Sequence, residues 1–260
     1  MNKYERYRIA IWILSFVVFI QSILLIILIS RPKKVIKVHA VIKGKIAIVI
    51  DDWGYNLDNL EILEGLRYPL TTAILPNLKY SLILSDELDK RGFEVILHLP
   101  MEPQEKLKLE DKTIMASMDE TNIKNILEQD LKSVPPAKGI SNHMGSKATQ
   151  DLRTMEVIFK ELKRKGLYFL DSFVSSKSVC SKLARKTNVP FVKRDIFLDN
   201  VPDSGYIKKQ IMKLKMKAKF FGQAIGIGHD RRHTLEVLKE VMPSIEEEGY
   251  KFVFVSELVK

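Results

Sequence analysis

Apolar runs recur along the chain from residue 45 onward, and most of them end in a polar or ionisable side chain. The clearest run covers residues 46–50 and stops at two adjacent carboxylates, Asp51 and Asp52. A continuous β-branched stretch of this length is typical of a strand buried on both faces, as in a parallel sheet covered by helices. Between the runs lie stretches with helical periodicity, several of which are followed by glycine.

This pattern predicts about eight alternations of strand and helix. We expect strands at 46–50, 71–75, 94–97, 138–141, 167–170, 190–193, 224–228 and 252–255. We expect helices at 57–66, 81–90, 121–131, 151–165, 179–187, 207–220 and 235–248, with Thr121 as a cap. The polar segment 103–118 is expected to form a long loop over a site. Such alternation predicts an α/β fold with a parallel sheet and right-handed crossovers.

The amino terminus has a different character, since residues 9–29 carry no charge. A helix of this length would span about 30 Å, the thickness of a bilayer core. The apolar stretch is longer than that of a signal peptide, and no obvious small-residue cleavage site follows it. We therefore expect a single-pass transmembrane anchor at 1–30, a linker at 31–43 and a globular domain at 44–260. The anchor would contact the lipid bilayer of the cell membrane, with the domain on the extracytoplasmic side.

Composition narrows the classes of partner. The 260 residues carry a formal charge of +10, from 42 Lys and Arg against 32 Asp and Glu, and the lysines are spread along the chain. Because no basic stretch is interleaved with aromatics, we expect no nucleic acid, and anionic lipid or an acidic cell-wall polymer is a plausible alternative. The one cysteine, Cys180, forms no internal disulfide and excludes a cysteine-based zinc site.

Polar side chains at the predicted strand ends are the main indication of a site. In a parallel barrel the carboxyl ends of the strands gather on one face, where ligands bind. Three of the five histidines fall at such ends. The strand-end residues are Asp51, Asp52, His98, Asn142, His143, Asp171, Arg194, Asp195 and His229.

Six motifs carry a family resemblance. In order along the chain they are IVIDDWG, EVILHLPMEP, GISNHMGS, FLDS, RDIFLDN and AIGIGHD. From Lys45 to about Val259 the chain resembles the divergent polysaccharide deacetylase family, a distant branch of the NodB-like carbohydrate esterases that remove N-acetyl groups from chitin-like and peptidoglycan sugars. The resemblance implies a distorted (β/α), TIM-like barrel of seven or eight parallel strands. It also implies a divalent metal, usually zinc, and a polysaccharide or peptidoglycan-like glycan as substrate.

The resemblance also implies roles for the strand-end residues. Asp51 would be the general base and Asp52 a metal ligand, while His229 would be the general acid. The family's His-x-x-x-His pair appears here as His98 followed by Glu102, so either His143 or Glu102 would complete the metal site. One carboxylate and two imidazoles make a sound three-ligand zinc set with the fourth position open.

The remaining candidates would act around the metal ligands. Asp171 would hold a ligand imidazole in its tautomer, and Asn142 would lie beside the ligands. Arg194 and Asp195 would orient substrate or form a local ion pair at the rim. The family's arginine-proline motif is not recognisable in this sequence. Asp199 is interpreted as a turn former.

Three hypotheses about function remain open. The first is a membrane-anchored, metal-dependent hydrolase that removes N-acetyl groups from a surface polysaccharide. The second is a catalytically weak or inactive carbohydrate-binding or scaffold protein, favoured by the altered histidine pair and by the unrecognised arginine motif. The third is another metal hydrolase on the same scaffold, such as a phosphodiesterase.

Overall fold

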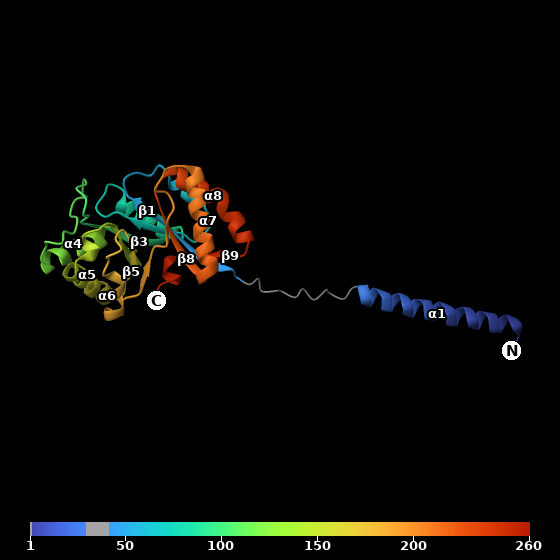
Figure 1. Ribbon diagram of the computed structural model, residues 1–260. Helices are drawn as coiled ribbons and strands as arrows, with labels where there is room; N and C mark the ends of the chain where they lie inside the picture. Colours follow the sequence, from blue (N-terminus) through green and yellow to red (C-terminus); the bar gives the residue numbers. More distant parts are fainter. Residues whose placement is uncertain (1, 30–41) are drawn as a thin grey trace. The chain divides into compact units, whose positions relative to one another are not determined.

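The computed structural model describes residues 2–29 and 42–260 of the chain (Figure 1). The chain divides into two compact units, Met1–Ala40 and Val41–Lys260, and each is described by itself. Most of the predicted linker, 31–43, lies outside the described residues. The boundaries predicted for the anchor and the linker therefore stay a prediction.

The first unit holds one helix, α1 (Lys3–Ile29). Its side chains are exposed as far as Ile26, which is unlike a helix buried in a soluble core. By length and composition α1 is suited to cross a membrane, although an amino-terminal signal sequence has the same properties. The prediction of a long apolar helix at this end is confirmed.

The second unit is built on one sheet in which every strand pairing is parallel. The strands are β1 (Gly44–Trp53), β2 (Thr71–Ile74), β3 (Glu94–Met101), β4 (Gly139–Met144), β5 (Tyr168–Asp171), β6 (Phe191–Lys193), β7 (Ile196–Phe197), β8 (Gln223–His229) and β9 (Tyr250–Phe252). Eight of them follow the order β6-β5-β4-β3-β2-β1-β8-β7, and β9 pairs with the start of β1. The predicted α/β sheet is confirmed, with one short strand more than the seven or eight expected.

The two ends of this strand order are neighbours in the chain. β6 ends at Lys193 and β7 begins at Ile196, yet β6 pairs with β5 and β7 pairs with β8. The backbone amide of Arg194 donates to Asp171, and that of Asp195 donates to Ile225. Two residues span only about 11 Å between the flanking Cα atoms. The sheet therefore curls until its ends approach each other, which produces the distorted barrel that the resemblance implied.

Helices cover the outside of the curled sheet. In Figure 1, α4, α5 and α6 lie on one side and α7 and α8 on the other. The helices are α2 (Leu60–Glu64), α3 (Ser81–Lys90), α4 (Glu120–Ser133), α5 (Leu152–Lys165), α6 (Cys180–Thr187), α7 (Ser204–Phe221) and α8 (Arg232–Glu247), with short 3-10 turns at η1 (Ala148–Gln150) and η2 (Val255–Glu257). The segment 103–118 contains no helix, as predicted.

The core consists of two hydrophobic clusters. The larger cluster lies between the sheet and the helices, and the smaller one gathers alternate side chains of the strands, such as Ala47, Val49 and Ile227. Because neighbouring residues of a strand point to opposite faces, the two clusters occupy the outside and the inside of the barrel. All their members lie between Ile46 and Leu258, so the domain has a core of its own.

The carboxyl-terminal segment differs from the predicted strand at 252–255. The strand β9 ends at Phe252, and the chain then turns into η2. The backbone amide of Val253 donates to Ile46, while Val253, Val255 and Leu258 belong to the interior cluster. These apolar residues therefore close the barrel at the amino-terminal end of β1 instead of extending the sheet.

The start of α4 also differs from the prediction. Asp119, rather than Thr121, caps the helix, and its side chain accepts a hydrogen bond from the backbone amide of Asn122 at 2.8 Å. Asp119 has an extended backbone, as N-cap residues usually have, whereas Thr121 lies inside the first helical turn.

This cap provides a test of the fold. We expect Asp119→Ala to lower the free energy of unfolding by about 1 kcal/mol, because one amide of the first turn loses its acceptor. Asp119→Asn is the matched control, since its side-chain oxygen accepts the same hydrogen bond and should retain most of the stability. Urea denaturation followed by circular dichroism measures both variants. Equal losses in the two would contradict the assignment.

Candidate metal centre

The site begins with an irregularity at the end of β1. Ile50 pairs with Thr72 and Trp53 pairs with Ile74, so β1 has one residue more than β2 over this interval. Asp52 has a left-handed backbone, with φ of 68°. Side chains alternate along a regular strand, but a bulge changes their direction. The bulge brings both Asp51 and Asp52 next to one imidazole, that of His98.

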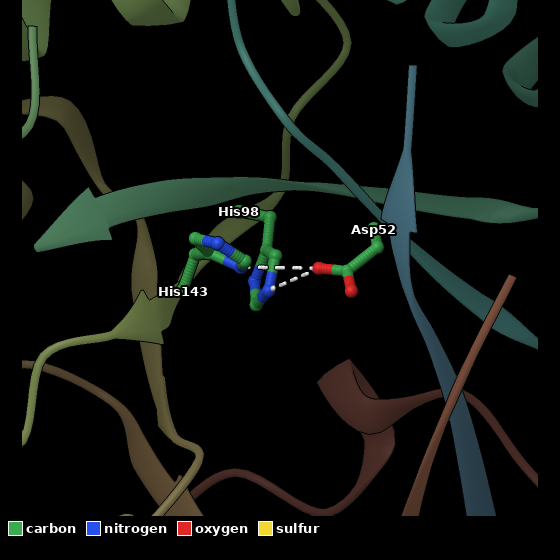
Figure 2. Close-up of side chains that lie close together, drawn as sticks. All are labelled: Asp52, His98 and His143. Carbon is green, nitrogen blue, oxygen red and sulfur yellow. Dashed lines mark ion pairs between the residues drawn. The ribbon is translucent and has the colours of Figure 1, made fainter. Parts of the chain in front are cut away.

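Three side chains from three strands converge at this point. Asp52 Oδ1 lies 3.0 Å from His143 Nδ1 and 3.4 Å from His98 Nε2, as Figure 2 shows. One ligand atom from each residue lies within 4.8 Å of the other two. Ligands of a tetrahedral zinc ion are roughly 3.4 Å apart, given bonds of about 2.1 Å. The spacing therefore suits a single metal ion.

The oxygen atoms of the two carboxylates also indicate a site for a cation. Asp51 Oδ1 and Asp52 Oδ1 are buried; the first has no hydrogen-bond partner among the described residues, and the second faces only the imidazole nitrogens of His98 and His143. A buried carboxylate oxygen without a partner is costly unless a cation compensates for it. Asp52, His98 and His143 also form the donor set of one carboxylate and two imidazoles found in catalytic zinc sites. The residues present therefore fit a divalent cation.

The two adjacent carboxylates have different electrostatic surroundings. Burial raises the pKa of Asp51, and the opposing effect of His98 does not compensate for it. Burial would also raise the pKa of Asp52, but the facing imidazoles of His143 and His98 outweigh it and hold that pKa well below its usual range. Environments that push two neighbouring pKa values apart are typical of acid–base sites. Asp52 is thus the better anion, and Asp51 the better proton acceptor.

Each histidine is positioned by its own strand. His98 lies on β3, and its Nδ1 is 2.7 Å from Ser141 Oγ on β4, which leaves Nε2 facing Asp52. At the end of β4, Asn142 Nδ2 donates to the carbonyl of Met144, at 2.7 Å. Met144 has a positive φ of 53°. The Asn142 amide therefore stabilises the turn that follows His143, without contacting the ligand atoms.

A fourth imidazole, His229, approaches from β8 on the other side of β1. Asp51 pairs with His229 in the strand register. His229 Nδ1 lies 2.7 Å from Asp199 Oδ1, and the other oxygen of Asp199 accepts from the amide of His229 and the hydroxyl of Thr234. Burial lowers the pKa of His229, but the bond to Asp199 outweighs it and the pKa is raised. Asp199 therefore holds His229 in orientation and favours its protonated form.

Asp199 is the important residue that sequence reasoning misassigned. The sequence suggested a turn former, whereas its side chain is fully buried and satisfied by three donors. It follows the two-residue strand β7, which is too short to produce a hydrophobic pattern. The only available signal was its place after an apolar pair in RDIFLDN.

Arg194 packs on the aromatic ring that stacks on His229. Its guanidinium lies 3.6 Å from the centroid of the Phe197 ring, and Phe197 in turn stacks on His229, with 6.0 Å between centroids. Arg194 Nε and Nη2 donate to the carbonyls of Ser172 and Phe173. Burial lowers the pKa of Arg194 from that of a free guanidinium, and the charges of Asp171, Asp195 and Asp51 oppose this effect.

The structure contradicts the expectation for Asp171 and the ion-pair alternative for Asp195. Asp171 does not hold an imidazole, because its oxygens accept from the amide of Phe173 and the hydroxyl of Ser178. Asp195 accepts from the amide of Ile225 and pairs with Lys217 at 3.3 Å. Among the described residues it therefore forms no local ion pair with Arg194. Both carboxylates stabilise loops at strand ends.

Glu102 lies outside the group of three ligands. Its carboxylate accepts from Lys147 Nζ at 2.6 Å and from the amide of Ala116 at 2.7 Å. Its backbone carbonyl accepts the amides of Lys147 and Ala148. Glu102 thus fastens the loop 103–118 to the segment after β4. Trp53 is fully buried, so it packs in the core and presents no face to a sugar.

Comparison with known proteins agrees with this architecture. The profile of the family described as divergent polysaccharide deacetylase matches residues 48–259. The chain is 35% identical over 202 residues to the uncharacterized protein YibQ of Escherichia coli K12, a match that covers 78% of this chain and 63% of that protein. This chain thus spans less than two thirds of the length of that relative.

Solved structures share the fold at low identity. A protein from Agrobacterium tumefaciens C58 superposes with a TM-score of 0.79 at 20% identity, over 88% of this chain and 92% of that one. The peptidoglycan N-acetylglucosamine deacetylase of Eubacterium rectale gives 0.54 at 13% identity, over 81% and 88%. A CE4 family pseudoenzyme from Bacillus anthracis gives 0.53 at 16% identity, over 85% and 66%. With the family profile matched over most of its length, the chain belongs to the divergent polysaccharide deacetylase family.

Proposed function

We propose that the protein is a membrane-anchored, metal-dependent hydrolase that removes N-acetyl groups from a cell-envelope polysaccharide. The observation that carries the proposal is the convergence of Asp52, His98 and His143 beside the buried carboxylate of Asp51. Family membership and the deacetylase fold support the reaction class.

The three converging side chains would hold the metal, with zinc as the ion that suits their donor set best. When bound, such a cation polarises an amide carbonyl and makes water a usable nucleophile. Ser141 would fix the tautomer of His98, because a proton on Nδ1 directed at the hydroxyl leaves Nε2 free to bind. Glu102 would not take part, since its oxygens already have partners.

Asp51 and His229 would move the protons. Asp51 Oδ2 lies 3.6 Å from His98 Nε2. Its other oxygen has no partner within residues 2–29 and 42–260, and its pKa is raised, so Asp51 suits the role of general base. His229 would donate a proton to the departing sugar amine, because an amide nitrogen leaves poorly without one. Asp199 is its positioning residue and keeps the imidazole protonated.

The anchoring part of the proposal rests on α1. The helix is about 40 Å long, and its apolar side chains are exposed from Ile9 to Ile26, about 27 Å, which is close to the thickness of the hydrocarbon core of a bilayer. In this proposal the domain lies outside the cytoplasm, where envelope glycan is accessible. The glycan would be the partner of the site.

A second candidate is a glycan-binding protein that has lost turnover. It is favoured by one feature, the replacement of the second histidine of the family pair by Glu102, which binds Lys147 instead of facing the site. The fold is shared with a CE4 pseudoenzyme as well as with deacetylases. Metal content and acetate release distinguish this candidate from the enzyme.

The ligand assignment can be tested by calorimetry. We expect His98→Ala and Asp52→Ala each to weaken zinc binding by more than about 100-fold, because outer-shell changes alone cost 10- to 100-fold. Glu102→Gln is the matched control and should bind zinc like the wild type. Titration calorimetry and elemental analysis of the folded variants measure this. Full zinc occupancy in either ligand variant, or its loss in the control, would show that the wrong residues were chosen.

The reaction class can be tested with a substrate panel. We expect the wild-type protein to release acetate from acetylated chito-oligosaccharide or peptidoglycan and to leave phosphodiesters intact. Asp51→Asn should keep its metal but lose acetate release by about 100-fold or more, as expected when a general base is removed. Absence of acetate release from a metal-loaded wild type would favour the binding protein. Normal turnover by the variant would remove Asp51 as the base.

The pairing of His229 with Asp199 predicts a pH effect with a defined sign. The negative carboxylate raises the pKa of His229, so Asp199→Asn should lower that pKa by about one pH unit. A general acid must be protonated, so the alkaline limb of the kcat/KM profile should move to lower pH. NMR titration of His229 and the rate profile measure both effects. The control is Asp195→Asn, which removes a carboxylate that does not bind His229 and should leave the His229 pKa and the rate profile unchanged. An unchanged His229 pKa in Asp199→Asn would contradict the role given to Asp199.

The same shift in the pKa of His229 predicts how the stability of the fold depends on pH. The pKa of His229 is raised in the folded protein, so its pairing stabilises the fold fully below the unfolded pKa, about 6.5. This stabilisation is lost as pH rises through the higher, folded pKa. Asp199→Asn should therefore reduce the free energy of unfolding more at about pH 6 than at about pH 9.

A further inference from the structure

The helix α7 has an apolar face that no other part of the described domain covers. Its buried stripe consists of Ile207, Ile211, Leu214 and Ala218, which pack into the core. The side chains of Met212, Met216 and Phe220 follow one another every four residues on the outer face and are 58%, 67% and 84% exposed. Residues at this spacing form one row along a helix. Phe221, 69% exposed, extends the row.

Lysines flank this row and are exposed with it. Lys209, Lys213 and Lys219 lie on the outer face, and within residues 42–260 no acidic side chain pairs with them. The lysines nearer the core differ, because Lys208, Lys215 and Lys217 form ion pairs with residues of the domain. The outer face of α7 therefore combines exposed large apolar side chains with uncompensated positive charge, which is the character of a helix that lies on an anionic membrane.

The end of α7 lies where the chain enters the domain. The backbone amide of Lys45 donates to the carbonyl of Gly222, directly after α7. Gly44 passes so close that a Cβ there would lie 2.4 Å from the carbonyl oxygen of Ala218. In Figure 1 the start of β1 lies beside the end of α7. Phe220 and Phe221 thus lie beside the point to which the amino-terminal segment is attached.

We propose that the outer face of α7, defined by Met212, Met216, Phe220, Lys209, Lys213 and Lys219, docks on the surface of an anionic lipid bilayer. This inference rests on the membrane anchoring proposed above. Ile29 and Gly44 are fifteen residues apart, a distance of at most about 50 Å, so anchoring by α1 would keep the face close to the bilayer. Apolar side chains would enter the headgroup boundary, and the lysines would contact lipid phosphates.

Other occupants of this face fit less well. The segment 31–40, which could in principle fold back on it, carries one arginine and three lysines and no acidic residue, so like charges would oppose the contact. A second copy of the chain would bring its own lysines to the same place. An anionic lipid surface supplies both the negative charge and the apolar layer that this face lacks.

The orientation that follows suits the proposed activity. The helix α7 runs antiparallel to β8, so its apolar end lies at the amino-terminal ends of the strands. Asp52, His98, His143 and His229 lie at the opposite, carboxyl ends. A domain docked by the outer face of α7 would therefore have its site at the end of the barrel remote from Phe220, where it stays open to the glycan.

A fluorescent probe on α7 tests this docking in the full-length chain. Met216→Cys is labelled with the environment-sensitive dye NBD, while the native Cys180 is buried and protected from the reagent. The chain is reconstituted in nanodiscs of phosphatidylcholine alone or with phosphatidylglycerol. We expect NBD emission to shift to the blue, and to be quenched by doxyl-labelled lipid, in the anionic discs. Leu82→Cys, 56% exposed on α3, is the matched label control and should show no change.

Variants that remove lysine charges from α7 provide a second test of docking. Each lysine near an anionic surface is worth about a fivefold change in binding, so Lys209→Gln, Lys213→Gln and Lys219→Gln together should weaken docking about 100-fold. The matched control replaces three exposed lysines outside α7 and should not weaken docking: Lys138→Gln, Lys160→Gln and Lys182→Gln.

The outcomes separate docking from anchoring. A chain that enters nanodiscs but shows no lipid-dependent change at position 216 overturns the docking and leaves the anchoring intact. A chain that does not enter nanodiscs contradicts the anchoring, and the same label with added anionic vesicles then decides the docking alone. A blue shift without lipid that grows with protein concentration would mean that a second copy covers the face, which also overturns the proposal.

Discussion

The site depends on two adjacent carboxylates at the end of the central strand, Asp51 buried and Asp52 partly buried. Asp51 and Asp52 follow five apolar residues of β1, and the left-handed backbone at Asp52 costs about 1–3 kcal/mol. Asp51 Oδ1, which is buried and has no hydrogen-bond partner in the described part of the chain, adds a further cost. Such an arrangement persists only where opposite charge compensates for it. The facing imidazoles of His98 and His143 provide part of that compensation, and the geometry leaves room for a cation to provide the rest.

The strand order explains why these groups divide into two sets. The sheet runs β4-β3-β2-β1-β8, so His98 and His143 reach Asp52 from one side of β1 and His229 approaches from the other. The strand β2 lies between β3 and β1, but it ends at Ile74 and contributes no side chain to the group of three candidate ligands. The candidate ligands His98 and His143 and the proposed proton donor His229 therefore lie on opposite sides of β1, the strand that carries Asp51 and Asp52.

Sequence pattern predicted the features that depend on long, periodic segments. The parallel sheet, the apolar amino-terminal helix and the strand-end positions of Asp52, His98 and His143 follow from apolar runs that stop abruptly. Features that depend on tertiary hydrogen bonds were missed. Asp199 follows a strand of two residues, and its partner His229 lies thirty residues later. No local pattern distinguishes such a carboxylate from a turn former, because only the curl of the sheet brings the two together.

The outer face of α7 could not be predicted from a local sequence pattern either. From the sequence this segment is a basic helix, and its lysines alone would suggest a solvated surface. Packing changes that reading, because it uses Ile207, Ile211 and Leu214 for the core and turns Met212, Met216 and Phe220 outward. Exposed apolar rows of this size are uncommon on a soluble domain without a partner. The row ends where the chain enters the domain, at the amino-terminal ends of the strands, whereas the carboxylates and imidazoles of the site lie at the carboxyl ends.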